Sequence, residues 1–80
     1  MPRGTKIKMN ELTEKIAALD IDEGIRIVHD NDKIFINKNW SGIFVVQFDN
    51  SEDFRYFDAA NQVTTLVKSK FGMKGTAWLY

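Results

Sequence analysis

Three short runs of β-branched and aromatic residues, separated by turn residues, constrain this chain more than any other feature. The runs are residues 25–29 (IRIVH), 33–37 (KIFIN) and 43–48 (IFVVQF). The first two are separated by Asp30-Asn31-Asp32, and the last two by five residues that end in a glycine. Such residues favour turns, and short connections join antiparallel strands. The sequence therefore predicts two successive β-hairpins.

The pattern changes from strand-like to helical at Asn50. Ser51 is a suitable N-cap, and Gly72 suits the left-handed position that follows a helix. Between them, apolar side chains recur at helical spacing. They are Tyr56, Ala60, Val63 and Val67. This pattern predicts a long helix over residues 51–71.

The two ends of the sequence add shorter elements. Residues 10–19 place Leu12, Ile16 and Leu19 on one helical stripe, with Asn10 as the expected N-cap. Residues 76–80 (TAWLY) carry no charge and follow a glycine, which predicts a last strand. We expect this strand to run parallel to residues 43–48 and 25–29, because the long helix reverses the chain direction. It could lie beside either of these strands, and a right-handed connection favours a place beside residues 25–29.

The predicted fold class is therefore α+β, with the order αβββαβ. Two layers are expected, in which the long helix covers one face of a four-stranded, mostly antiparallel sheet. The 80 residues make a single domain. Residues 1–8, which contain three basic side chains, are expected to form a flexible N-terminal arm.

The composition gives little indication of catalysis. The chain has 11 basic and 11 acidic residues, a single histidine and no cysteine. We therefore expect no catalytic residue, no cofactor and no zinc site, and a protein that is not an enzyme. No apolar run is long enough to span a membrane, and the N-terminus lacks the apolar stretch of a signal peptide. A cytoplasmic location and no membrane partner are expected.

Neither the histidine nor the acidic residues form a recognisable site. His29 stands at the end of a strand beside a turn, where a structural role is favoured over catalysis. Five acidic residues lie between positions 20 and 32, but Gly24 occupies the place of a ligand in the calcium-loop pattern. Glycine-rich phosphate-binding motifs do not occur. Turn and capping roles explain these residues better.

Strand alternation divides the sheet residues into two sets. One set is apolar and suits packing beneath the long helix: Ile25, Ile27, Ile34, Ile36, Phe44, Val46, Phe48, Ala77 and Leu79. The second set mixes aromatic, aliphatic and basic side chains: Arg26, Val28, Lys33, Phe35, Asn37, Ile43, Val45, Gln47, Thr76, Trp78 and Tyr80. The second face is then covered by helix 10–19, by a partner or second copy, or by a nucleic acid.

The leading hypothesis is a small interaction module that self-associates as a homodimer or binds a protein partner through the second sheet face. The expected partner-binding residues are Arg26, Lys33, Phe35, Trp40, Val45, Trp78 and Tyr80. The alternative is nucleic-acid binding by the same face and the basic N-terminus. The αβββα order is similar to that of the double-stranded RNA-binding fold. However, those domains begin their second helix with lysines, whereas Ser51-Glu52-Asp53 stand here, so no family is inferred.

Overall fold

The computed structural model of the protein describes residues 5–48, 53–72 and 74–80. Within these residues the chain forms six strands, two α-helices and one short 3₁₀ helix, η1. In chain order the elements are β1 (Thr5–Ile7), η1 (Met9–Glu11), α1 (Leu12–Ala17), β2 (Gly24–His29), β3 (Asp32–Lys38), β4 (Phe44–Phe48), β5 (Phe54–Phe57), α2 (Ala60–Phe71) and β6 (Thr76–Leu79). The α+β class is confirmed, but the sheet is larger than predicted.

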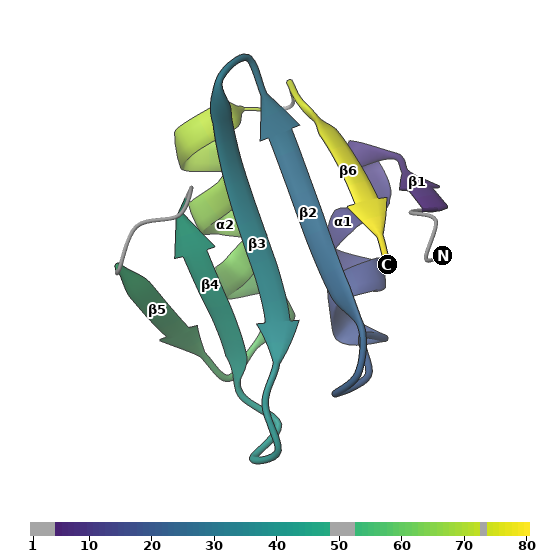
Figure 1. Ribbon diagram of the computed structural model, residues 1–80, viewed down its shortest axis with the longest axis vertical. Helices are drawn as coiled ribbons and strands as arrows, with labels where there is room; N and C mark the ends of the chain where they lie inside the picture. Colours follow the sequence, from purple (N-terminus) through teal and green to yellow (C-terminus); the bar gives the residue numbers. More distant parts are fainter. Residues whose placement is uncertain (1–4, 49–52, 73) are drawn as a thin grey trace.

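All six strands belong to one antiparallel sheet with the order β1-β6-β2-β3-β4-β5 (Figure 1). The strands predicted over residues 25–29, 33–37 and 43–48 correspond to β2, β3 and β4, and their two hairpins are confirmed. Gly42, in the second hairpin, has a φ of 79°, which suits a residue without a Cβ atom.

The hydrophobic core lies between the sheet and the helices. Strand alternation places the isoleucines of β2 and β3, together with Val46, on the helix side, where they are fully buried. Ala77 is also fully buried, Phe44 is nearly so, and Phe48 and Leu79 are partly buried against the same cluster. The apolar face predicted from the sequence is thus confirmed as the core face of the sheet.

The long helix predicted over residues 51–71 is shorter. Helix α2 begins at Ala60 and ends at Phe71, where Gly72 follows with a φ of 66°. Residues 54–57 instead form strand β5, and Tyr56 therefore belongs to the sheet rather than to a helical stripe. The predicted cap Ser51 lies outside the described residues. Alternating aromatic side chains fit the pleated edge of the sheet, which outweighs the helical spacing of the apolar residues.

The last strand lies beside β2 as predicted, but its direction is opposite to the prediction. β6 runs antiparallel to β2, and it also pairs with β1 on its other side. Strand β5 is the cause, because one additional reversal of the chain before α2 inverts the direction of every later element. The pairing of β1 also corrects part of the N-terminal prediction, since Thr5–Ile7 form a strand. Residues 1–4 of the predicted arm lie outside the described residues.

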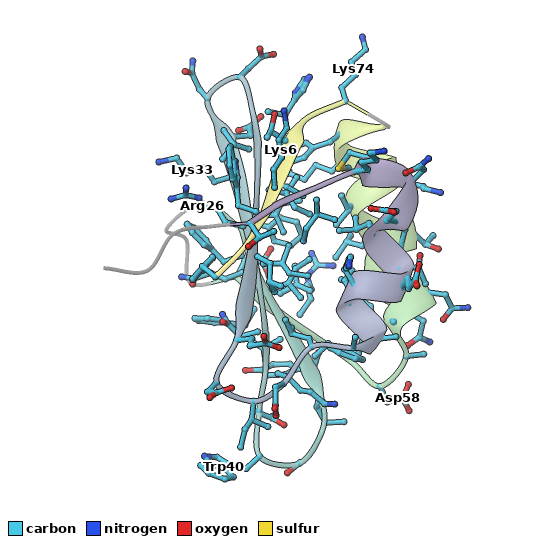
Figure 2. All side chains as sticks on the ribbon, turned by 90° about the vertical axis from the view of Figure 1, so that its right-hand side faces the viewer. Lys6, Arg26, Lys33, Trp40, Asp58 and Lys74 are labelled. Carbon is cyan, nitrogen blue, oxygen red and sulfur yellow. The ribbon has the colours of Figure 1, made fainter. Side chains whose placement is uncertain are left out.

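Both helices cover the same face of the sheet (Figure 2). Helix α1 packs beside α2, and its apolar residues Leu12 and Ile16 are fully buried in the shared core. The predicted helix 10–19 is split into η1 and α1, and Asn10 lies inside η1 rather than capping a helix. Of the three alternatives for the second sheet face, coverage by this helix is therefore excluded. In the described residues, no element covers that face.

Candidate binding face of the sheet

The sheet face opposite the helices, here called the outer face, carries the candidate site. Residues that pair directly across neighbouring strands point to the same side of a sheet. Because Ala77 and Ile27 pair on the core side, the next pair along, Trp78 and Arg26, points outward. Figure 2 shows the labelled Arg26 and Lys33 on the side away from both helices.

One row of side chains on the outer face crosses all six strands. Arg26 pairs with Trp78 on one side and with Phe35 on the other. The pairing continues from Trp78 to Lys6 in β1, and from Phe35 through Gln47 to the β5 edge. The complete row is Lys6, Trp78, Arg26, Phe35, Gln47 and Phe54. Strands lie about 4.8 Å apart, so this row is about 24 Å long.

A second row lies one step along the same face. Tyr80 exchanges two backbone hydrogen bonds with Gly24, of 2.8 and 2.9 Å. A Cβ atom at Gly24 would lie 3.2 Å from the ring of Tyr80, so the glycine allows this ring to approach the backbone of β2 closely. From Gly24 the row continues through Asn37 and Val45 to Tyr56.

The charge of the outer face has one sign. Its cations are Lys6, Arg26 and Lys33, all of which are exposed. Among the strand residues that the structure describes on this face, there is no aspartate or glutamate. The chain as a whole has equal numbers of acidic and basic residues. The fold therefore produces a local positive surface on a neutral molecule.

Aromatic side chains lie beside these cations and continue across the outer face to β5. Phe35 and Trp78 are half-buried in the centre of the face. Phe54, Tyr80 and Tyr56 are 43%, 45% and 64% exposed. Exposed aromatic rings beside cations form a surface that suits planar, negatively charged ligands, because rings stack and cations neutralise charge.

Of the seven partner-binding residues predicted from the sequence, six share the outer face. Trp40 is the exception, because it lies at the tip of the β3–β4 hairpin and is 89% exposed (Figure 2). It lines a pocket of about 510 Å³ together with Asp20, Ile21, Asp22, Lys38 and Asn39. Trp40 is thus separate from the outer face.

Three residues of the outer face were not predicted from the sequence. Lys6 was assigned to a flexible arm, and Phe54 and Tyr56 were assigned to a helix. All three belong to edge strands, β1 and β5, that were not predicted. The alternation of aromatic residues in Phe54-Arg55-Tyr56-Phe57 was the available signal for β5.

The single histidine lies on the core side of the sheet. Its ring stacks against Phe71 with 5.4 Å between the ring centroids, and Nδ1 lies 3.6 Å from a carboxylate oxygen of Asp30. The described residues contain no group of three or more His, Asp or Glu side chains that could hold a metal ion. His29 is therefore placed as a packing residue at the end of β2.

Comparisons with known proteins identify no relative. No protein-family model matches the sequence, and no curated protein or solved structure shows significant similarity to the chain. Among the described residues, no helix combines the length and the apolar composition needed to cross a membrane. The outer face itself is therefore the basis for assigning a function.

Proposed function

We propose that the outer face binds single-stranded nucleic acid. The observation that supports this function best is the row from Lys6 to Phe54, in which cations and aromatic rings are interspersed across six strands. Proteins that bind single strands combine cations that neutralise phosphates with rings on which bases stack. The row supplies both kinds of group on one open surface.

The charge pattern disfavours self-association of the face as its main role. Two outer faces in contact would bring Lys6, Arg26 and Lys33 of one copy against the same cations of another. No carboxylate on the described strands of this face would compensate them. Like charges in contact are destabilising. A ligand that brings negative charge therefore fits this face better than a second copy does.

The shape of the face favours a single strand over a duplex. Trp78 and Phe35 are separated by two strand spacings, about 10 Å, with Arg26 between them. Rings embedded in a sheet contact bases only when those bases are unstacked and turned toward the protein. Bases inside a duplex are paired and stacked, so they are not available to such rings.

Salt dependence provides the primary test. Titration of a fluorescent oligothymidylate should show an affinity that falls with salt, because each neutralised phosphate releases counterions. For three cations the slope of log K against log salt concentration should be about −2, since single strands give about −0.7 for each contact. Arg26→Ala and Lys33→Ala should each make this slope less negative by about 0.7.

The matched control is Lys68→Ala, which removes an exposed lysine from α2 on the opposite side of the molecule. It should leave both affinity and slope unchanged. Absence of binding to single strands at low salt would contradict the proposal. Equal binding to an acidic peptide with the same slope would instead assign the face to an acidic protein partner.

Stacking is tested by the aromatic residues of the row. Trp78→Ala and Phe35→Ala should each weaken binding by about 1–3 kcal/mol, the usual contribution of one base–ring stack. Their salt slopes should stay at the value of the unchanged protein, because no phosphate contact is lost. A slope that changes as much as for Arg26→Ala would show that the aromatic variants act by disturbing the face.

A second candidate function is protein docking at the hairpin tip. Trp40 is 89% exposed, and Ile21 beside it is 40% exposed. Tryptophan is the residue type most enriched among binding hot spots, and an unburied one favours a contact surface. Asp20 and Asp22 border the same pocket, so the matching partner would be a basic protein segment. Trp40→Ala should abolish such binding and leave oligonucleotide affinity unchanged.

A further inference from the structure

Strand β5 forms one edge of the sheet, where its backbone groups can pair with a further strand. Edge strands are commonly protected by charged side chains, above all lysine, by proline or by short length. The opposite edge, β1, has three residues and carries Lys6. β5 has four residues, contains neither lysine nor proline, and presents two exposed aromatic side chains, Phe54 and Tyr56. Within the described residues, no strand pairs with its outer side.

The backbone groups on the open side of β5 belong to Phe54 and Tyr56. Asn39 N–H donates to the carbonyl oxygen of Ile43 at 3.0 Å, so the backbone of Ile43 is directed toward β3. Bonding direction alternates along an antiparallel strand, and β4 therefore turns its even-numbered residues toward β5. Their partners in β5 are Arg55 and Phe57. Phe54 and Tyr56 alternate with these two residues, so their N–H and C=O groups are directed away from the sheet.

The charged side chains on either side of Phe54 are complementary to the same side chains of a second copy. Asp53 and Arg55 lie on either side of Phe54, and both are 53% exposed. Within one chain, Arg55 Nε donates to Asp53 Oδ1 at 3.2 Å. If a second β5 pairs in the antiparallel direction with Phe54 opposite Phe54, each Asp53 stands opposite an Arg55 of the other copy. The ion pair between Asp53 and Arg55 can then form between the two copies instead of within one chain.

Other two-fold registers lack this match. A two-fold axis through Arg55 would place two guanidinium groups opposite each other. An axis through Tyr56 would place Arg55 opposite Phe57. If the second β5 is shifted by one residue from any of these pairings, core-side residues of one copy stand opposite outer-face residues of the other. Residues that pair directly across two strands must share one face of the sheet, so such registers are not allowed. Charge complementarity therefore selects the axis through Phe54.

We propose that two copies of this chain associate through β5, in an antiparallel two-fold pairing with Phe54 opposite Phe54. Each Phe54 exchanges N–H and C=O bonds with its counterpart, and Asp53 of each copy pairs with Arg55 of the other. The two sheets join at their edges, so the two outer faces form one surface. The row from Lys6 to Phe54 then continues into the same row of the second copy in reverse order.

The test is the solution mass of the protein and its charge-reversal variants, measured by sedimentation without any oligonucleotide, so its failure leaves the nucleic-acid proposal untouched. The unchanged protein should pass from monomer to dimer between micromolar and millimolar concentration. Arg55→Asp and Asp53→Arg should each weaken association at least about tenfold, since each places like charges opposite one another. An equimolar mixture of the two variants should regain association within about threefold of the unchanged protein.

The mixture separates this proposal from a purely structural role of the ion pair. Loss of the Asp53–Arg55 contact within one chain would not be repaired by mixing two defective chains. Lys68→Asp, a charge reversal at an exposed position of α2, should leave association unchanged. If a variant loses its circular dichroism spectrum, Phe54→Lys replaces it, because two lysines on the axis should also prevent pairing. A protein that stays monomeric, or a dimer that neither reversal weakens, would overturn the proposal.

Discussion

The hydroxyl of Thr13 in α1 donates a hydrogen bond of 2.7 Å to the hydroxyl of Thr64 in α2. Thr64 in turn donates to the carbonyl oxygen of Ala60 at 3.2 Å, and it is the one polar residue that is buried in the described part of the chain. The two helices are thus joined by a specific polar contact in addition to apolar packing. This contact fixes α1 beside α2 on the core side of the sheet, which leaves the outer face uncovered by described elements.

Thr64→Val tests this contact, because valine keeps the volume of threonine and lacks its hydroxyl. We expect a loss of about 1–2 kcal/mol in the free energy of unfolding, because the Thr64 hydroxyl makes two hydrogen bonds and each contributes about 1 kcal/mol net. For a domain of this size, each kcal/mol lowers the melting temperature by about 4–8 °C. Thr65→Val is the matched control, since Thr65 is exposed and bonds only within its own helix. Equal melting temperatures for the two variants would contradict the assigned role.

Two glycines with positive φ should respond differently to alanine. Gly42 has a φ of 79°, and an added Cβ atom would meet no other atom within 4 Å. Gly75 has a φ of 108°, and a Cβ atom there would lie 3.1 Å from the Val28 carbonyl oxygen. Gly42→Ala should cost about 1 kcal/mol from backbone strain alone. Gly75→Ala should cost about 2–3 kcal/mol, because strain and crowding add. Urea unfolding curves give the free energy of unfolding of both variants. A larger loss of stability for Gly42→Ala than for Gly75→Ala would contradict this prediction.

Trp78→Ala should destabilise the protein less than Ile27→Ala, although it removes many more atoms. Ile27 is fully buried on the core face, so its truncation should cost about 2–5 kcal/mol. Trp78 is half-buried on the outer face, and we expect a loss of about 1–2 kcal/mol. Thermal unfolding of both variants gives the comparison. A larger loss for Trp78→Ala would show that another part of the chain covers the outer face.

Ligand binding should be reported by one tryptophan and not by the other. In Trp40→Phe, the remaining fluorescence comes from Trp78, and an oligothymidylate should quench it through stacking. In Trp78→Phe, the remaining Trp40 lies at the hairpin tip, and its fluorescence should not change on binding. Quenching of Trp40 alone would transfer the candidate site from the outer face to the hairpin tip.

Deletion of residues 76–80 should abolish cooperative folding. β6 lies between β1 and β2, so its loss removes an internal strand and leaves β1 without a neighbour in the described sheet. The domain is small and its stability is marginal, which makes such a loss decisive. Tyr80→Ala is the control, because the backbone bonds between Tyr80 and Gly24 do not need the ring. A sharp thermal transition in the truncated protein would contradict this expectation.

The central hairpins could be predicted because every local signal agrees. In β2 and β3, β-branched residues, period-two alternation and turn residues all favour the same structure, and the resulting pairs such as Ile27 and Ile34 are observed. The outer face could be predicted for the same reason. Once β2, β3 and β4 are placed, alternation determines which side each residue occupies.

Strand β5 could not be predicted because its residues carry conflicting signals. Ser51, Glu52 and Asp53 resemble a helix start, and Tyr56 falls in helical register with Ala60. Helix α2 begins at Ala60, and its N-cap residue Ala59 makes no side-chain capping hydrogen bond, so the sequence marks this start only weakly. The tertiary contact between β5 and β4 decides the structure there, and it also sets the direction of β6.

The position of α1 could not be deduced from the sequence either. Its stripe of Leu12, Ile16 and Leu19 shows that one side of the helix is buried, but either face of the sheet could provide that burial. The deciding partners lie on α2, including Thr64, which is far away in the sequence. Lys6 belongs to the outer face because β1 pairs with β6. A strand of three residues is too short to be predicted from its sequence pattern.

The insertion of β6 between β1 and β2 has a consequence for the order of folding. Thr5 and Leu79 are partners, so this contact closes a loop that contains nearly the whole described chain. Closing a loop of that length costs more entropy than forming the β2–β3 and β3–β4 hairpins, whose strands are neighbours in sequence. The hairpins should therefore form first and β1 should join last, after β6 has docked against β2. During synthesis on the ribosome, the N-terminal strand must wait unpaired until the residues of β6 have left the exit tunnel.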